Sequence, residues 1–207
     1  MLEKIESKVS ECFISGNSEI LKDLFDIFGG ITKAGKIAIL IKEKMFLTKL
    51  KKLILGLKEI NREDKAKFCE QIREKTKGSD GLFIITTIEH IENIKKVDIL
   101  TNLCIAAIKE QISIDDFFRL VVILERIPYT DIENIRHYEN PIYEPGITEI
   151  LFAAGAIKLT TIYDNEENRY SLNSIGKKFL EVGLGISIYS PIIPGSKDKS
   201  LDFYEGK

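Results

Sequence analysis

The residue types that most often do chemistry are few in this chain and are scattered along it. Neither of its two histidines, His90 and His137, has a cysteine, an aspartate or the other histidine at the short intervals of a metal site. Its three cysteines, Cys12, Cys69 and Cys104, form no CxxC pair, and such spacing is typical of buried thiols in a reducing compartment. The sequence therefore predicts no metal site and no cofactor.

Two other patterns suggest chemistry, and each has a simpler interpretation. Gly29-Gly30 precedes Lys33 and Lys36, which could attract phosphate, but the spacing differs from the GxxxxGK[ST] of a nucleotide-binding loop. Asp115-Asp116 falls where the first turn of a helix favours acids. No GxGxxG, GxSxG or kinase signature occurs. We expect a protein that is not an enzyme; an enzyme with a site assembled from distant residues is the alternative.

Composition and charge narrow the function classes further. The 207 residues are 44% hydrophobic and 30% charged, as in a folded protein, and the net charge is −2. General nucleic-acid binding usually requires a basic surplus, so nucleic acid is not the expected partner. The N-terminus carries Glu3 and Glu6 and no apolar core of a signal peptide. We expect a cytoplasmic location, with peripheral attachment at the inner face of the membrane left open.

Positive charge is concentrated in residues 31–60, which hold eight lysines and two glutamates, a net charge of +6. Apolar residues recur there at steps of three and four, so the pattern predicts a basic amphipathic helix. The inward stripe consists of Phe46, Leu50, Leu53, Leu57 and Ile60. The apolar run from Ile37 to Ile41 is far shorter than the roughly 20 residues needed to span a bilayer.

Two interpretations of this helix are open. Its apolar stripe either packs in the core with the lysines in water, or the helix lies on an anionic membrane or an acidic partner, with a glycine-rich hinge before it. Each lysine near an anionic membrane contributes about 1 kcal/mol, so most of them must reach the surface together. The candidate binding residues are Lys33, Lys36, Lys42, Lys44, Lys49, Lys51 and Lys52.

The spacing of apolar residues predicts a mainly α fold, a multi-helix bundle over residues 1–139. Helices are expected over residues 2–14, 19–28, 62–77, 96–110 and 114–126, with another after Ser79 and a short one containing Ile132 and Ile135. Asn61 and Ser113 have the form of helix N-caps. The helix after Ser79 should bury Leu82, Ile85, Ile88 and Ile91. The helix over residues 96–110 is apolar almost all round, which predicts the central core helix.

A proline- and glycine-rich connector at residues 140–146 marks a predicted boundary, and residues 140–207 form a small α+β unit with a tail. Its predicted order is helix 147–154, strand 156–163, polar turn, strand 170–172 and helix 174–182, like the back half of a winged helix. The first helix carries one charge, Glu149, and no side chain suited to reading bases. A hairpin that closes a core or meets a protein is therefore preferred to a DNA-binding unit.

The C-terminal sequence also resembles a known family. Leu151-Phe-Ala-Ala-Gly155-Ala-Ile157, a polar turn, and Tyr170-Ser-Leu172-Asn173-Ser-Ile-Gly176-Lys-Lys-Phe179-Leu180 are similar to the ending of the Abi-alpha family. Those are bacterial helical proteins associated with abortive infection, a form of resistance to phage. Asn173 stands where threonine is usual. The resemblance implies a phage-conflict setting with action at the membrane, and it supplies no catalytic residues.

These observations together predict a non-enzymatic interaction protein in phage–host conflict, on the side of defence or of counter-defence. It would act through a protein partner or an anionic membrane surface, using the basic helix. Self-association is left open. The alternative is a regulator that binds nucleic acid through its winged-helix-like unit.

Overall fold

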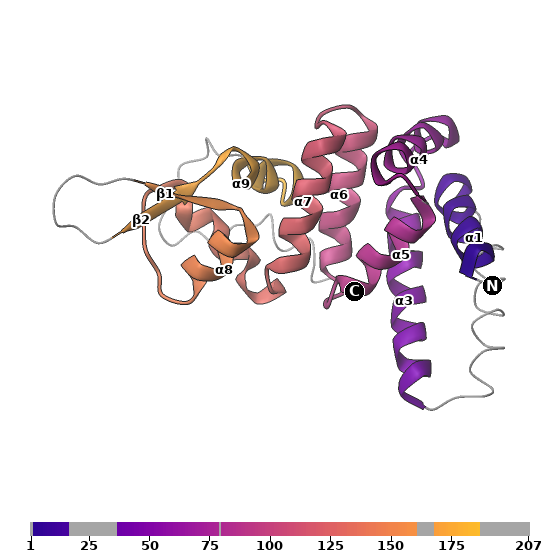
Figure 1. The fold of residues 1–207 in the computed structure, drawn as a ribbon, viewed down its shortest axis with the longest axis horizontal. Helices are drawn as coiled ribbons and strands as arrows, with labels where there is room; N and C mark the ends of the chain where they lie inside the picture. The colour runs from indigo at the N-terminus through magenta and orange to yellow at the C-terminus, as the bar shows by residue number, and fades with distance from the viewer. Residues whose placement is uncertain (1, 17–36, 79, 161–167, 187–207) are drawn as a thin grey trace.

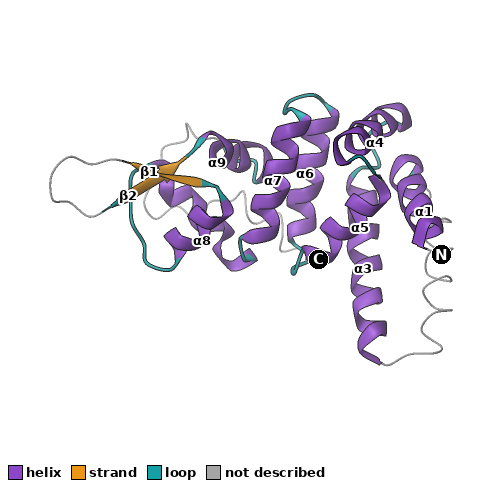
Figure 2. Ribbon diagram, viewed as in Figure 1, coloured by secondary structure: helices purple, strands orange, loops and turns teal. Residues whose placement is uncertain are grey.

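The computed structural model describes residues 2–16, 37–78, 80–160 and 168–186, which fold as a mainly helical protein with one small sheet (Figure 1). Figure 2 shows helices over most of the described chain and strands at one end only. This confirms the predicted fold class, a helical bundle followed by a small α+β unit. The predicted helix 19–28, the glycine-rich hinge, Lys33 and Lys36 lie outside the described residues.

The helices of the bundle follow one another along the chain with short connections. They are α1 (Leu2–Ser15), α3 (Ile37–Gly56), α4 (Arg62–Thr76), α5 (Asp80–His90), α6 (Lys96–Ile108), α7 (Ile114–Arg126) and the 3-10 helix η1 (Tyr129–Glu139). The C-terminal unit contains α8 (Ile147–Ala154), β1 (Ile157–Thr160), β2 (Arg169–Leu172), α9 (Ser174–Lys178) and the π-helical turn η2 (Phe179–Gly183). Figure 1 places the β1–β2 hairpin at the opposite end of the molecule from α1.

Local capping explains where several helices begin and end. The side chain of Asn61 accepts a hydrogen bond from the amide of Asp64 at 2.8 Å, and Ser113 accepts one from Asp116 at 3.1 Å. Both satisfy amides that have no partner inside the helix. Gly155 ends α8 with φ of 82°, in the left-handed region. The predicted caps are confirmed.

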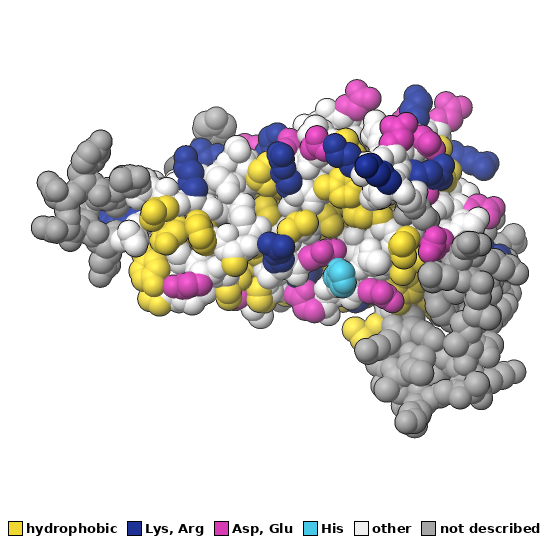
Figure 3. Space-filling model, in the orientation of Figure 1, with side chains coloured by type: hydrophobic (Ala, Val, Ile, Leu, Met, Phe, Trp, Pro, Cys, Tyr) yellow, Lys and Arg dark blue, Asp and Glu magenta, His cyan; other side chains and the backbone are white. Residues whose placement is uncertain are grey.

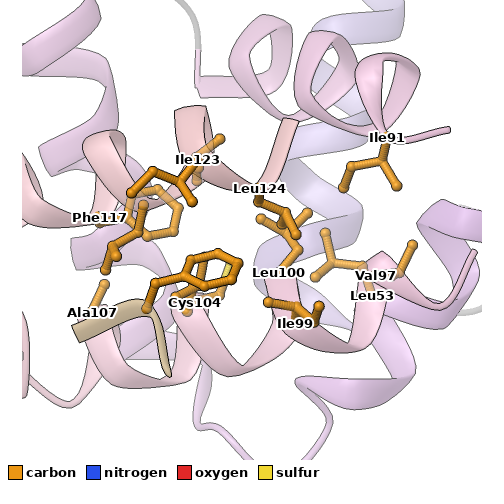
Figure 4. Packing of buried hydrophobic residues seen from close by; sticks show 14 of the residues in the cluster. Leu53, Ile91, Val97, Ile99, Leu100, Cys104, Ala107, Phe117, Ile123 and Leu124 are labelled. Carbon is orange, nitrogen blue, oxygen red and sulfur yellow. The ribbon is translucent and has the colours of Figure 1, made fainter. Parts of the chain in front are cut away.

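The hydrophobic core is centred on α6, as the sequence predicts. This helix contacts α3, α4, α7 and η2. In Figure 4, Leu100 and Cys104 of α6 lie between Leu53 of α3 and Phe117 of α7. The three cysteines are free and buried, which confirms their predicted placement. Burial raises the pKa of the Cys12 thiol to about 11, so this thiol is protonated and inert at neutral pH.

The inner side of α5 differs from the prediction. Leu82, expected in the core, is 41% exposed, and Ile85 is only partly buried, whereas Ile84 and Ile88 are buried. The reason is a close approach between α5 and α1: a Cβ on Gly81 would lie 2.2 Å from the Glu6 carbonyl oxygen. This contact sets the rotation of α5 and turns Leu82 to solvent.

The C-terminal unit is joined to the bundle by polar contacts and by a shared core. Lys178 of α9 is hydrogen-bonded to the carboxylate of Asp116 in α7, and Asn102 of α6 donates to the Gly183 carbonyl at 3.0 Å. Leu151 and Phe179 belong to the same buried cluster as the bundle's core. The core is therefore continuous across the predicted boundary between residues 139 and 140, and that boundary stays a prediction.

We expect Asp116 to stabilise the fold in a pH-dependent manner. The hydrogen bond from Lys178 holds the pKa of Asp116 below its usual value, so the stabilisation is present at neutral pH and is lost as pH falls through the folded-state pKa. Asp116→Asn should lower the free energy of unfolding by about 1–2 kcal/mol at pH 7. Urea unfolding at pH 7 and at acid pH measures both effects.

The neighbouring Asp115 supplies a matched control, because it makes an exposed ion pair with Lys75. Asp115→Asn should change the free energy of unfolding by less than about 1 kcal/mol. Equal losses for the two variants at pH 7 would contradict this account of Asp116.

Candidate functional site

The outer side of α3 carries a row of exposed residues, here called the basic stripe: Lys44, Thr48, Lys51 and Leu55. Steps of four, three and four place them on one face, over a length of about 17 Å at the rise of an α-helix. Leu55 is 55% exposed, and the flanking Met45 is 47% exposed. The stripe therefore combines positive charge with uncovered apolar surface.

The opposite side of α3 lies in the core. Phe46, Leu50, Leu53 and Leu57 are all buried, so the interpretation of the apolar stripe as core is confirmed. Ile60, the last residue of the predicted stripe, is partly buried against this core. The rotation of α3 thus decides which lysines reach solvent.

The predicted binding lysines have different fates. Lys33 and Lys36 lie outside the described residues, and Lys42 lies in α3 with its side chain undescribed. Lys44 and Lys51 are exposed, as a binding role requires. Lys49 and Lys52 instead bind groups within the chain. The structure thus brings two of the seven predicted residues together on an open surface.

Lys49 is buried, with 6% of its surface exposed. Its ammonium donates to the carbonyl of Ile91 and, at 3.3 Å, to that of Ile88, at the C-terminal end of α5. Burial lowers the pKa of Lys49, while Glu92 and Glu89 act in the opposite direction. Lys49 therefore caps α5 from another helix, and it cannot reach a partner.

Lys52 joins α3 to the start of α6. Its ammonium binds the Asp98 carboxylate at 2.5 Å and the Ile94 carbonyl at 3.3 Å. Asp98 lies in the first turn of α6, where the helix dipole favours an acid. Neutralised in this way, Lys52 adds little positive charge to the outer face of α3.

A second exposed surface lies on the C-terminal unit, and it is apolar. It is called here the aromatic cluster and consists of Tyr143, Phe152, Leu159 and Tyr170. Phe152 is 52%, Leu159 49% and Tyr143 40% exposed. The ring of Tyr170 lies 5.5 Å from that of Phe152 and 6.3 Å from that of Tyr143, centroid to centroid. Figure 3 shows hydrophobic side chains gathered at this end of the molecule.

The polar side chains of α8 are already engaged. Thr148 is buried against Tyr138 at 2.7 Å. Glu149 accepts hydrogen bonds from the Tyr143 hydroxyl at 2.9 Å and from the Gly146 amide at 2.5 Å. The helix thus presents Phe152 and Ala153 to solvent. Such a surface suits contact with a protein better than reading of bases.

The sequence analysis did not single out the aromatic cluster, although one signal was available. Leu151 and Phe152 are adjacent in a short helix, so they point about 100° apart and cannot both lie at its most buried position. In the structure Leu151 is fully buried and Phe152 faces outward.

Chemical sites are sparse in the described part of the chain. No group of three or more His, Cys, Asp or Glu residues is arranged there to hold a metal ion. A groove of about 200 Å³ between α7, α8 and α9 has Arg119 as its one titratable lining residue. No described helix is long and apolar enough to cross a membrane.

No protein-family model matches this chain, and searches of curated proteins and of solved structures find no significant match. The argument for function therefore rests on the surfaces of the molecule itself.

We expect Lys49 to contribute to stability and Lys51 to contribute almost nothing. Lys49→Ala removes a buried side chain and leaves two carbonyls without their donor, so the free energy of unfolding should fall by about 2–4 kcal/mol. Lys49→Met keeps most of the apolar stem and should lose less. The exposed Lys51→Ala should stay within about 0.5 kcal/mol of wild type in urea unfolding. Similar losses for Lys49→Ala and Lys51→Ala would show that Lys49 is not buried as described.

Proposed function

We propose that this chain is a non-enzymatic interaction protein that binds an acidic protein partner through the basic stripe of α3. The observation that supports the proposal is the pairing of two exposed cations, Lys44 and Lys51, with two exposed apolar side chains, Met45 and Leu55. Burying the apolar side chains provides affinity, and the cations steer and orient an acidic surface.

A protein partner is favoured over a membrane by the number of charges that remain available. Lys44, Lys51 and Lys58 are the exposed lysines along the described part of this face, and Lys58 lies 3.5 Å from Glu59. At about 1 kcal/mol each they supply at most roughly 3 kcal/mol of attraction to an anionic membrane. A single myristoyl chain supplies about 5–6 kcal/mol, and its attachment is already marginal.

The proposed setting is phage–host conflict. It is supported by the resemblance of the sequence from Leu151 to Leu180 to the ending of the Abi-alpha family. Much of that pattern is needed for the fold: Leu151, Leu172, Phe179 and Leu180 are buried. The proposal leaves open whether the protein acts in defence or in counter-defence.

An anionic membrane is the second candidate partner, and the same residues favour it. An exposed leucine and methionine beside lysines on one helix face are also what an interfacial helix presents to lipid headgroups. Flotation with vesicles that contain anionic lipid, at low and at high salt, separates this candidate from a protein partner.

The test of the proposed function is a pair of charge reversals in the basic stripe. Lys44→Glu combined with Lys51→Glu should abolish co-purification of the partner from phage-infected cells and abolish the effect of the protein on phage plating. Folding should be retained, because both side chains are exposed. The matched control combines Lys67→Glu and Lys109→Glu, which change the net charge equally at exposed positions of α4 and after α6.

The outcomes separate the alternatives. Loss of co-purification in the stripe variant but not in the control supports the proposal. Flotation that requires anionic lipid, fails at high salt and is lost in the stripe variant would replace the protein partner with a membrane. Unchanged phage plating and unchanged co-purification in the stripe variant would contradict both.

A further inference from the structure

The hairpin of the C-terminal unit has one covered edge and one open edge. β1 pairs with β2 in antiparallel register, with Leu159 opposite Tyr170. On its other side β2 pairs with Ile142, an element that the sequence did not predict: Tyr170 donates to the Ile142 carbonyl at 2.9 Å and accepts from its amide at 3.0 Å. β2 is therefore the middle of three extended segments, and β1 lies at the edge.

This geometry fixes the direction of the Leu159 backbone groups. The N–H and C=O of Tyr170 both point toward Ile142, so the pair formed by Tyr170 and Leu159 is of the non-hydrogen-bonded kind. The N–H and C=O of Leu159 consequently point away from β2, to the outer edge of β1. Over the described ranges, neither group is hydrogen-bonded to another element.

The side chains beside this edge are apolar and uncovered. The cross-strand pair Ile157–Leu172 is buried, and the next pair on the same face, Leu159–Tyr170, belongs to the exposed aromatic cluster. The core face of the hairpin thus continues beyond the part of the protein that covers it. An edge strand with exposed apolar side chains readily pairs with another strand.

We propose that a second copy of this chain occupies this edge, with the two β1 strands antiparallel and Leu159 opposite Leu159 about a two-fold axis. Each Leu159 N–H then donates to the Leu159 carbonyl of the other copy. The aromatic clusters of both copies gain cover. This interface goes beyond the proposed function, because it uses a different surface from the basic stripe.

Charge favours this register and a second copy as the occupant. With Leu159 on the axis, Lys158 lies opposite Thr160 of the other copy, so no like charges face each other directly. A register centred on Lys158 would place two lysines directly opposite, which is destabilising. The contact is isologous, so the same short strand supplies both sides of the interface.

Disulfide trapping tests the register directly. In a narrow antiparallel pair the two Cα atoms lie about 5.5 Å apart, within the range that a disulfide bridges. Under mild oxidation, the full-length Leu159→Cys variant should form a covalent dimer in high yield. The matched Lys158→Cys variant should not, because Thr160 lies opposite it. The native cysteines Cys12, Cys69 and Cys104 are buried and should not compete.

Charge variants test the interface in solution by light scattering coupled to gel filtration. Wild type should be dimeric, and Leu159→Lys alone or Leu159→Glu alone should raise the dissociation constant by about 100-fold or more, because like charges then meet on the axis. A mixture of the two should restore a 1:1 dimer. The equally exposed Leu55→Lys variant should dimerise as wild type does.

Three results would overturn the proposal. The first is wild-type protein that is monomeric at concentrations on the order of 100 μM. The second is a dimer that tolerates both charge variants, which would place the dimer interface elsewhere. The third is equal cross-linking of the Leu159→Cys and Lys158→Cys variants. If a charge variant fails to fold, the cross-linking pair still decides between the registers.

Discussion

The burial of one side of α3 is the constraint on which this account of function depends. Leu50, Leu53 and Leu57 occupy the core beside α6, and this packing sets the rotation of the helix. Once that rotation is set, Lys44 and Lys51 face solvent while Lys49 is carried into the structure. A strongly basic segment is thereby divided into lysines that hold the fold together and lysines that are available for binding. Its net charge alone overstates what a partner can contact.

The two exposed surfaces lie on different parts of the fold and have different chemistry. The basic stripe belongs to the bundle and mixes cations with two apolar side chains. The aromatic cluster belongs to the C-terminal unit, where α8 presents Phe152 at a position where a DNA-binding helix would need polar groups. A shared core and the contact between Asp116 and Lys178 join the two parts. One molecule can thus pair with its own copy at one end and bind a partner elsewhere.

Much of the fold was predictable because its signals are local. Helix caps at Asn61 and Ser113 depend on one side chain and an amide three residues away. The core position of α6 follows from its apolar circumference. What failed depends on contacts distant in sequence. The rotation of α5 is set by Gly81 against Glu6, and the role of Lys49 depends on carbonyls about forty residues further along. The strand pair between Ile142 and Tyr170 lacks a periodic signal, because one residue has no period.

The central claim, that the fold separates binding lysines from structural ones, is tested most directly by the modification rates of individual lysines. Brief acetylation of the native protein followed by mass spectrometry gives a rate for each side chain. The account predicts fast modification of Lys44 and Lys51 and strong protection of Lys49, with the buried Lys65 and Lys96 as internal references for protection. Denaturant should remove the difference. If Lys49 reacts as fast as Lys51 in the folded protein, α3 is not rotated as described, and the proposed binding surface is wrong.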